Sequence, residues 1–310
     1  MLVKLNKLIS YLLAFGLKIT FFVLILPTFF PSKRNFLRKH KLVRRFLEKK
    51  FPKLDETESS LDNTMPNNLP IWVFWYQGYD SMPELVRICF QSVLDNNNGK
   101  NVILVTKDNV NDYIVFPEHV TEKFEKGLIT LTHYSDLLRL GLLAKHGGLW
   151  ADATILVTKP IDFEKWPSAI FTIRQRENIG RFVTQMRWTG FLIGGQKANP
   201  VFVSSYNLLC EYHKDSKPLI DYLLIDYVLD FVYSHDENVS KQIDALPLTN
   251  SELYTLSGSL NDRFDRATFD AILSETQFFK LNRRVQTKEK TAEGDSTVFA
   301  YLKSKFISSK

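Results

Sequence analysis

Short β-rich runs alternate with amphipathic helical patterns from Ile71 onward, and this alternation limits the possible folds more than any other feature. The run 71–76 (IWVFWY) is typical of a buried strand, residues 83–97 have helical periodicity, and 101–106 (NVILVT) is a second strand pattern. Strands that alternate with helices predict an α/β fold in which covering helices pack on a mainly parallel sheet.

The alternation continues along the chain. Strands are predicted over 149–151, 169–174 and 190–194, and helices over 117–126, 136–146, 200–213 and 219–233. Ser135 is expected to cap the helix that starts at Asp136, and Gly147 is expected to end it.

A membrane-associated helical segment is predicted ahead of this domain. Residues Leu8 to Phe30 are almost wholly apolar, and about 20 such residues are enough to span a bilayer. Insertion of the Lys18 charge at the bilayer centre would cost roughly 2.5–3.5 kcal/mol. The segment therefore either spans the bilayer with the Lys18 side chain snorkelling to the interface, or lies in one leaflet. No small-residue cleavage site follows Pro27, so we expect the segment to remain as an anchor.

The next residues, 32–53, contain ten lysines and arginines. One helical face is apolar and consists of Phe36, Val43, Leu47, Phe51 and Leu54. This pattern predicts an amphipathic helix on an anionic membrane surface, with a solvated basic linker as the alternative. Because the basic residues follow the apolar segment, the positive-inside rule places the rest of the chain at the cytoplasmic face of a bacterial cell membrane.

We therefore expect three parts: residues 1–54 as anchor and basic helix, 55–70 as a polar linker with two prolines, and 71–310 as the α/β domain. Residues 1–53 carry a net charge of +12, so the remainder carries −6 within the total of +6. An acidic body lacks the basic face that nucleic acid requires, so no nucleic-acid partner is expected.

The passage 135–154 (SDLLRLGLLAKHGGLWADAT) carries the strongest chemical signal. Asp136 and Arg139 are three residues apart, so they share one helical face and could bind a sugar hydroxyl and a phosphate; an ordinary surface ion pair is the alternative. Asp152 follows a short strand, and ligands of open α/β sheets bind at the carboxyl ends of strands. A carboxylate there can hold a divalent cation that neutralises a diphosphate leaving group.

Three motifs together resemble those of a known family. The segments 135–139 (SDLLR), 147–154 (GGLWADAT) and 74–83 (FWYQGYDSMP) are similar to motifs of the DXD sugar-binding glycosyltransferases related to glycosyltransferase family 32, in particular their capsular polysaccharide synthesis branch. The resemblance covers roughly residues 70–165 well. It implies a GT-A-like nucleotide-sugar-binding domain.

The resemblance also implies roles for single residues. Trp75 would stack on the nucleobase, while Asp136 and Arg139 would contact the sugar and its phosphates. Asp152 would hold Mn²⁺ or Mg²⁺. The implied catalytic residues are Asp136, Arg139 and Asp152, and the implied donor-binding residues are Trp75, Asp136, Arg139, Gly148 and Trp150. The chain departs from the family at Thr154, which replaces the second acid of the motif with a hydroxyl, a weaker metal ligand.

The protein is therefore expected to be a hexosyltransferase. It would move a sugar from a nucleoside diphosphate sugar to a capsular or exopolysaccharide intermediate, and we expect the donor to be UDP-linked. The resemblance alone implies retention at the anomeric carbon, and no nucleophile can be assigned. A polyprenyl-linked acceptor would explain the basic anchor. The alternative, which Thr154 keeps open, is a non-catalytic partner of a polysaccharide assembly complex that retains the nucleotide-sugar fold.

Other titratable side chains have ordinary interpretations. Cys89 and Cys210 lie far apart without metal-ligand spacing, which excludes a disulfide scaffold and a zinc module. His133 and His146 are interpreted as surface residues, and neither has a cysteine or second-histidine partner that would make a metal site credible. Three aspartates on the predicted helix 219–233 are expected on a solvated face, with an acceptor base as the alternative: Asp221, Asp226 and Asp230.

Overall fold

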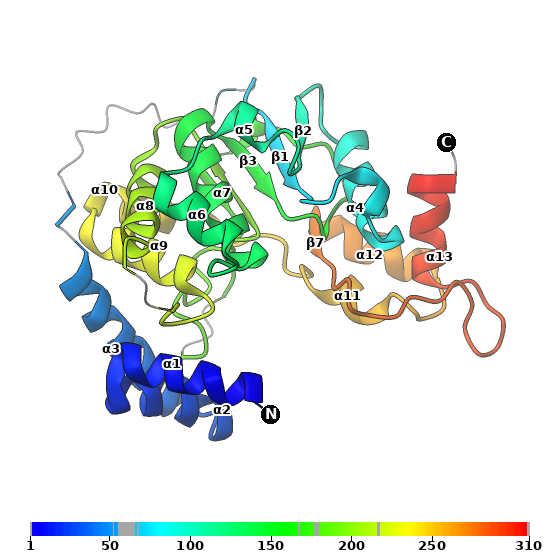
Figure 1. Cartoon of the computed structure of the whole chain (residues 1–310). Helices are drawn as coiled ribbons and strands as arrows, with labels where there is room; N and C mark the ends of the chain where they lie inside the picture. Colours follow the sequence, from blue (N-terminus) through cyan, green and yellow to red (C-terminus); the bar gives the residue numbers. More distant parts are fainter. Residues whose placement is uncertain are drawn as a thin grey trace.

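A mixed α/β fold with a five-stranded central sheet is seen in the computed structural model, which describes residues 2–51, 53–54, 66, 68–166, 168–176, 180–215 and 218–308 (Figure 1). The strand order is β2-β1-β3-β6-β5. The strands are β1 (Ile71–Phe74), β2 (Val102–Val105), β3 (Gly148–Ala151), β5 (Ile170–Thr172) and β6 (Leu192–Gly195).

The expected parallel pairing is present in the first half of the sheet. Strand β1 pairs in parallel with β2 and β3, whereas β6 runs antiparallel to both β3 and β5. Strands β1, β2, β3, β5 and β6 all lie inside or overlap the runs predicted from the sequence. An apolar run carries no signal of strand direction, so the antiparallel half could not be read from the sequence.

Helices cover both faces of the sheet, as the alternation predicts. Because side chains alternate across a strand, Trp72 and Trp150 face the core under α7 (Leu131–His146), α8 (Pro200–Tyr212) and α9 (Leu224–His235). Val73 and Leu149 face the other side, where they pack against residues of α4 (Glu84–Asp95). The remaining helices of this half are α5 (Val110–Tyr113), α6 (Glu118–Glu125) and α10 (Glu237–Asp244).

Helix α7 starts earlier than the sequence predicted. Thr130 is its N-cap and accepts a hydrogen bond from the backbone N–H of His133, so Ser135 lies inside the helix rather than at its start. Leu131 and Tyr134 extend the apolar periodicity backwards, which explains the extra turn. The predicted end is confirmed, because Gly147 has a φ of +70°, a conformation that favours glycine.

A second layer completes the C-terminal part. Strand β4 (Ile155–Val157) follows the acidic motif directly and pairs antiparallel with β7 (Phe278–Lys280). This pairing brings the residues after 277 next to Asp152 and Thr154. The other elements here are the helices α11 (Thr255–Ser259), α12 (Arg266–Glu275) and α13 (Val298–Lys303), the 3₁₀ turns at Tyr79–Ser81 and Phe163–Lys165, and the π-helical turn Ser304–Ser308.

The predicted basic helix is present as α3 (Lys33–Lys50), capped by Ser32, and it packs on the body. Its apolar residues Val43 and Leu47 are buried in the core cluster that also contains α9 residues. Arg44 donates two hydrogen bonds, of 2.6 and 2.9 Å, to the buried carboxylate of Asp230. The face expected against a membrane is therefore covered by α9. Most of the predicted linker 55–70 lies outside the described residues.

The apolar N-terminal segment folds as α1 (Leu2–Ile19), a π-helical stretch Thr20–Ile25 and α2 (Leu26–Phe29). Leu8–Phe29 is long and apolar enough to cross a membrane, with a mean hydropathy of 2.2 and 17% of the most apolar stretch buried. Gly16 interrupts the helix, with φ +76° and ψ 171°. Leu13 and Leu17 on α1 are 81% and 79% exposed.

Candidate active site

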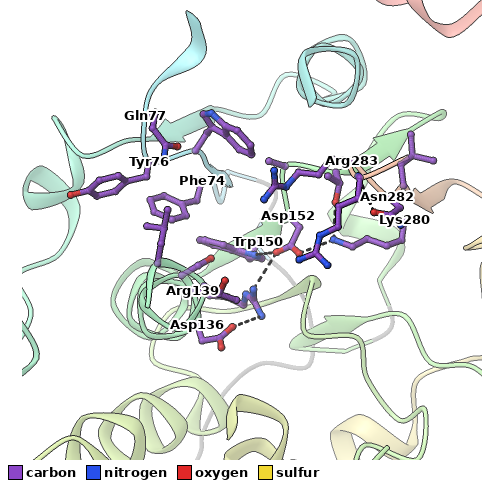
Figure 2. A pocket seen from close by; sticks show the side chains of 18 of the residues that line it. Phe74, Tyr76, Gln77, Asp136, Arg139, Trp150, Asp152, Lys280, Asn282 and Arg283 are labelled. Carbon is purple, nitrogen blue, oxygen red and sulfur yellow. Dashed lines mark hydrogen bonds and ion pairs between the residues drawn. The ribbon is translucent and has the colours of Figure 1, made fainter. Parts of the chain in front are cut away.

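A pocket of about 860 Å³ opens at the carboxyl ends of β1 and β3 (Figure 2). Helix α7 forms one wall, and the segment that follows β7 forms the opposite wall. Five of the six residues predicted for the donor site line the pocket, together with Thr154: Trp75, Asp136, Arg139, Trp150 and Asp152. These come from three separate motifs, which the fold gathers at one edge of the sheet.

Arg139 lies between two carboxylates at the floor of the pocket. Its guanidinium is 3.5 Å from an oxygen of Asp136 and 3.2 Å from Oδ1 of Asp152, and it lies over the Trp150 ring. The side chain is only 8% exposed, and its Nε has no hydrogen-bond partner within the described part of the chain. Gly190 leaves room for this arginine, because a Cβ there would lie 3.1 Å from its Nη1. The pair is therefore buried rather than a surface ion pair.

Asp152 accepts hydrogen bonds from three donors. Oδ1 accepts from Arg139 and from the Trp150 indole N–H at 2.9 Å, and Oδ2 accepts from Lys280 Nζ at 2.8 Å. Burial alone would raise the pKa of this carboxyl, but the charges of Lys280 and Arg139 outweigh it, so the pKa is lowered. Asp152 is a carboxylate at neutral pH.

Lys280 is the main residue of the pocket that was not predicted from the sequence. It is the last residue of β7 and pairs with Ile155, and its Nζ donates to Thr154 Oγ1 at 2.8 Å as well as to Asp152. Arg283 and Arg284 line the same wall. The basic stretch KLNRR at 280–284 was the available signal, but only the pairing of β4 with β7 shows that it faces the acidic motif.

The structure distinguishes the two first-strand tryptophans. Trp72 is 1% exposed and its N–H donates to the Gly147 carbonyl, so it belongs to the core. Trp75 lines the pocket, and its N–H donates to Ser81. Trp75, which the resemblance implies for the nucleobase, is therefore the one of the two that lies in the pocket. Trp150 both packs in the core and lines the pocket.

Gly148 is not brought into the pocket. It is the first residue of β3, at the end of the strand away from Asp152, and it does not line the cavity. Its φ is +104°, and a Cβ there would lie 2.2 Å from the Pro70 carbonyl oxygen. The glycine is required because the backbones of β3 and the residue before β1 approach closely, so its role is packing rather than donor contact.

The expectation that His133 lies at the surface is wrong. His133 is buried and its Nε2 lies 2.8 Å from Nε2 of His213, with its Nδ1 3.4 Å from Asp136. Burial lowers the pKa of His213 to about 3, so that ring is neutral and can share a proton with its partner. This pair lies next to Asp136, which one histidine in a sequence pattern cannot reveal.

The aspartates of the 219–233 region are not a solvated face. Asp230 is 1% exposed and is held by Arg44 and Arg187, while Asp221 pairs with Lys39 at 2.5 Å. Asp226 accepts from the Trp188 N–H at 3.2 Å. Burial raises the pKa of Asp226 to about 7, and the nearby Asp136 adds to the shift. The sequence could not show this, because α3 and α8 pack on α9 and together with the ion pairs take these aspartates away from a solvated face.

The oxygen atoms of Asp152 and Thr154 do not fit as ligands of a divalent cation. Mg²⁺ and Mn²⁺ prefer several oxygen ligands, with carboxylates among them. Here both Asp152 oxygens and the Thr154 hydroxyl already accept from cationic or N–H donors. Across the residues that the structure places, no group of three His, Cys, Asp or Glu side chains could hold a metal.

Comparison with known proteins adds independent information. An O-glycosyltransferase, braB of Annulohypoxylon truncatum, is 29% identical over 145 residues, which cover 42% of this chain and 34% of that protein. The chain thus spans about a third of the length of this curated relative. The solved PaToxG glycosyltransferase has a TM-score of 0.37 and 14% identity, over 67% of this chain and 81% of that one. This structural similarity is too low to bear on the site.

A family model described as "Capsular polysaccharide synthesis protein" matches residues 25–302. The match includes the basic helix α3, the whole α/β body and β7 with Lys280. Because it covers most of the sequence, the chain belongs to the capsular polysaccharide synthesis protein family.

Proposed function

We propose that the protein is a glycosyltransferase that uses a nucleoside diphosphate sugar as donor, UDP-linked by our expectation. The observation that carries this proposal is the convergence of Arg139 and Lys280 on Asp152 beside Trp75 and Trp150. A cationic floor suits a diphosphate, and aromatic side chains suit a nucleobase and a sugar ring. The family match and the O-glycosyltransferase relative support the same class of reaction.

The reaction places a large charge on the leaving group. The bond between the sugar C1 and the diphosphate oxygen breaks, a bond from C1 to an acceptor hydroxyl oxygen forms, and the acceptor proton passes to the departing nucleoside diphosphate. Arg139, held by Asp136 and stacked on Trp150, can offset the charge that develops on the diphosphate. A hexose as the transferred group, a GT-A-like donor domain and retention at C1 are further parts of the proposal and rest on the family resemblance.

We further propose that the acceptor is a capsular or exopolysaccharide intermediate on a polyprenyl lipid at the cytoplasmic face of the membrane. The exposed side chains of Leu13, Leu17 and Phe29 offer an apolar surface, and the kink at Gly16 favours a segment that lies in one leaflet. Helix α3 keeps basic residues beside this surface, which suits anionic lipid headgroups.

The test is a panel of nucleotide sugars given to the full-length protein in buffer with Mg²⁺ and Mn²⁺, scored for release of nucleoside diphosphate. We expect release with at least one donor. Asp152→Asn should reduce it by about 100-fold or more, because the carboxylate that orients Arg139 and Lys280 is lost. Asp108→Asn is the control, since Asp108 is exposed and outside the pocket. Equal activity of the two variants would show that Asp152 is not part of the active site.

A further inference from the structure

We propose that the Lys280 ammonium takes the place of a divalent cation, so that this enzyme binds and releases its nucleoside diphosphate without a metal. The inference rests on the proposed function and specifies how the same site handles negative charge. It follows from the position of Lys280 Nζ, which contacts the two side chains that stand at the acidic positions of the family motif, Asp152 and Thr154.

The geometry around Nζ resembles the environment of a bound cation. Nζ lies 2.8 Å from Oδ2 of Asp152, 2.8 Å from Oγ1 of Thr154 and 4.8 Å from the centre of the Phe191 ring. An ammonium has three N–H donors, of which Asp152 and Thr154 take two. One donor is left for a phosphate oxygen, and Lys280 lines the pocket where that oxygen would lie.

The fold holds this lysine in place. The backbone N–H of Lys280 donates to the Leu253 carbonyl, and the N–H of Leu281 donates to the Thr154 carbonyl at 2.9 Å. The strand that presents the ammonium is thus hydrogen-bonded to the motif residue it contacts. The Lys280 side chain is 22% exposed and Asp152 is 27% exposed, so the pair is screened from bulk solvent but open to the pocket.

The charge of the motif matches one ammonium better than a divalent cation, because Thr154 carries a hydroxyl where the family has a carboxylate. With Thr154 in place of an acid, a metal would have one carboxylate fewer to bind, whereas a single positive charge is matched by Asp152 alone. Four basic side chains and two acidic ones line the pocket, a net charge of +2: Arg139, Lys280, Arg283 and Arg284 against Asp136 and Asp152. This surplus suits a diphosphate without an added cation, and a divalent ion next to Nζ would be repelled.

The experiment measures binding of nucleoside diphosphates to the full-length protein by isothermal titration calorimetry, with UDP, GDP, CDP and ADP as probes. Each is titrated in EDTA and in Mn²⁺. We expect the preferred nucleotide to bind equally well in both. Lys280→Met should weaken binding in EDTA by about tenfold or more, the usual worth of a charged hydrogen bond, while Lys280→Arg should retain part of it. Lys288→Met, on an exposed lysine outside the pocket, should bind like the wild type.

Lys280→Asp provides the positive test. This change places a second carboxylate beside Asp152 and removes the ammonium, so nucleotide binding should be lost in EDTA and recovered in Mn²⁺. Wild-type binding that disappears in EDTA would overturn the inference while leaving the proposed function intact, and so would unchanged binding by a folded Lys280→Met protein. The wild-type comparison needs no variant, so it decides the matter even if Lys280→Met fails to fold. No binding of any nucleotide would refute the proposed function and the inference together.

Discussion

Single side chains in the pocket depend on one another through Arg139. This guanidinium contacts both Asp136 and Asp152, and the plane of Trp150 supports it. A planar fork can serve two carboxylates and a phosphate at once, whereas an ammonium is a point charge. The identity of this residue therefore matters more than its charge.

We predict that Arg139→Lys lowers the rate of nucleoside diphosphate release by about 10²–10³, the usual loss when a group that stabilises transition-state charge is removed. The melting temperature should change little, because the charge and most of the packing remain. The control is Arg266→Lys, which alters an exposed ion pair with Asp270 on α12 and should leave both quantities unchanged. Normal turnover by Arg139→Lys would show that the ion pairs of Arg139 have only a structural role.

Asp226, whose pKa is raised by desolvation, should make stability depend on pH. Its pKa is raised to about 7 in the folded protein, so the folded state holds a proton that the unfolded chain loses at lower pH. The free energy of unfolding should therefore fall as pH rises from the ordinary aspartate range to about 7, by roughly 1.4 kcal/mol for each unit of pKa difference. Asp226→Asn should flatten the melting temperature across this range. A wild-type curve without such a slope would contradict the buried neutral carboxyl.

The sequence predicted much of the pocket at this scale because Asp136, Arg139 and Asp152 lie in contiguous motifs with regular spacing. Lys280 lies 128 residues from Asp152, and no local pattern joins them. Gly148 was misplaced for a related reason: a glycine next to a motif serves the backbone as readily as a ligand, and only the approach of Pro70 shows which.

Among the elements, helix α3 connects the N-terminal segment to the α/β body. The sequence predicted which residues form the apolar face of this helix. It could not show whether lipid or α9 covers that face. In the structure Val43 and Leu47 are essentially fully buried, and Arg44 pairs with Asp230. The strands and helices of the body were predictable because their periodicity is strong. The pairing of β4 with β7 was not, because it joins short strands far apart in the sequence.

We predict that Leu47→Ala lowers the free energy of unfolding by about 2–5 kcal/mol, the cost of a cavity in a packed core. Leu37→Ala on the same helix should change it by less than about 0.5 kcal/mol, because Leu37 is 41% exposed. Chemical denaturation of the full-length protein measures both. If the two variants are equally stable, α3 does not form part of the folded body.

The exposed residues of α1 should control membrane attachment. Replacing Leu13 and Leu17 together by aspartate should abolish cosedimentation with vesicles that contain anionic lipid, because apolar contact with the acyl chains is lost. Nucleotide binding should persist, since neither residue lines the pocket. High salt should weaken the wild-type attachment through the basic residues of α3. If the double variant still cosediments with the vesicles and high salt does not release it, these side chains do not control attachment.

At the scale of the whole molecule, charge and apolar surface are divided between two ends. The first 53 residues carry +12 and the rest carries −6, so the chain has a basic N-terminal part and an acidic body, whose candidate donor pocket is lined by four basic and two acidic side chains. This division suits the function proposed above, in which the body holds a soluble donor and the N-terminal part rests on the bilayer that carries the acceptor.

The most direct test of the central claim is an experimental structure of the full-length protein with its preferred nucleoside diphosphate bound. We expect the diphosphate in the pocket at the carboxyl ends of β1 and β3, within hydrogen-bond distance of Arg139 and Lys280, which Figure 2 labels. The base should lie beside Trp75, which also lines this pocket. A nucleotide bound elsewhere, for example in the second large cavity lined by Trp166 and Phe171, would contradict it.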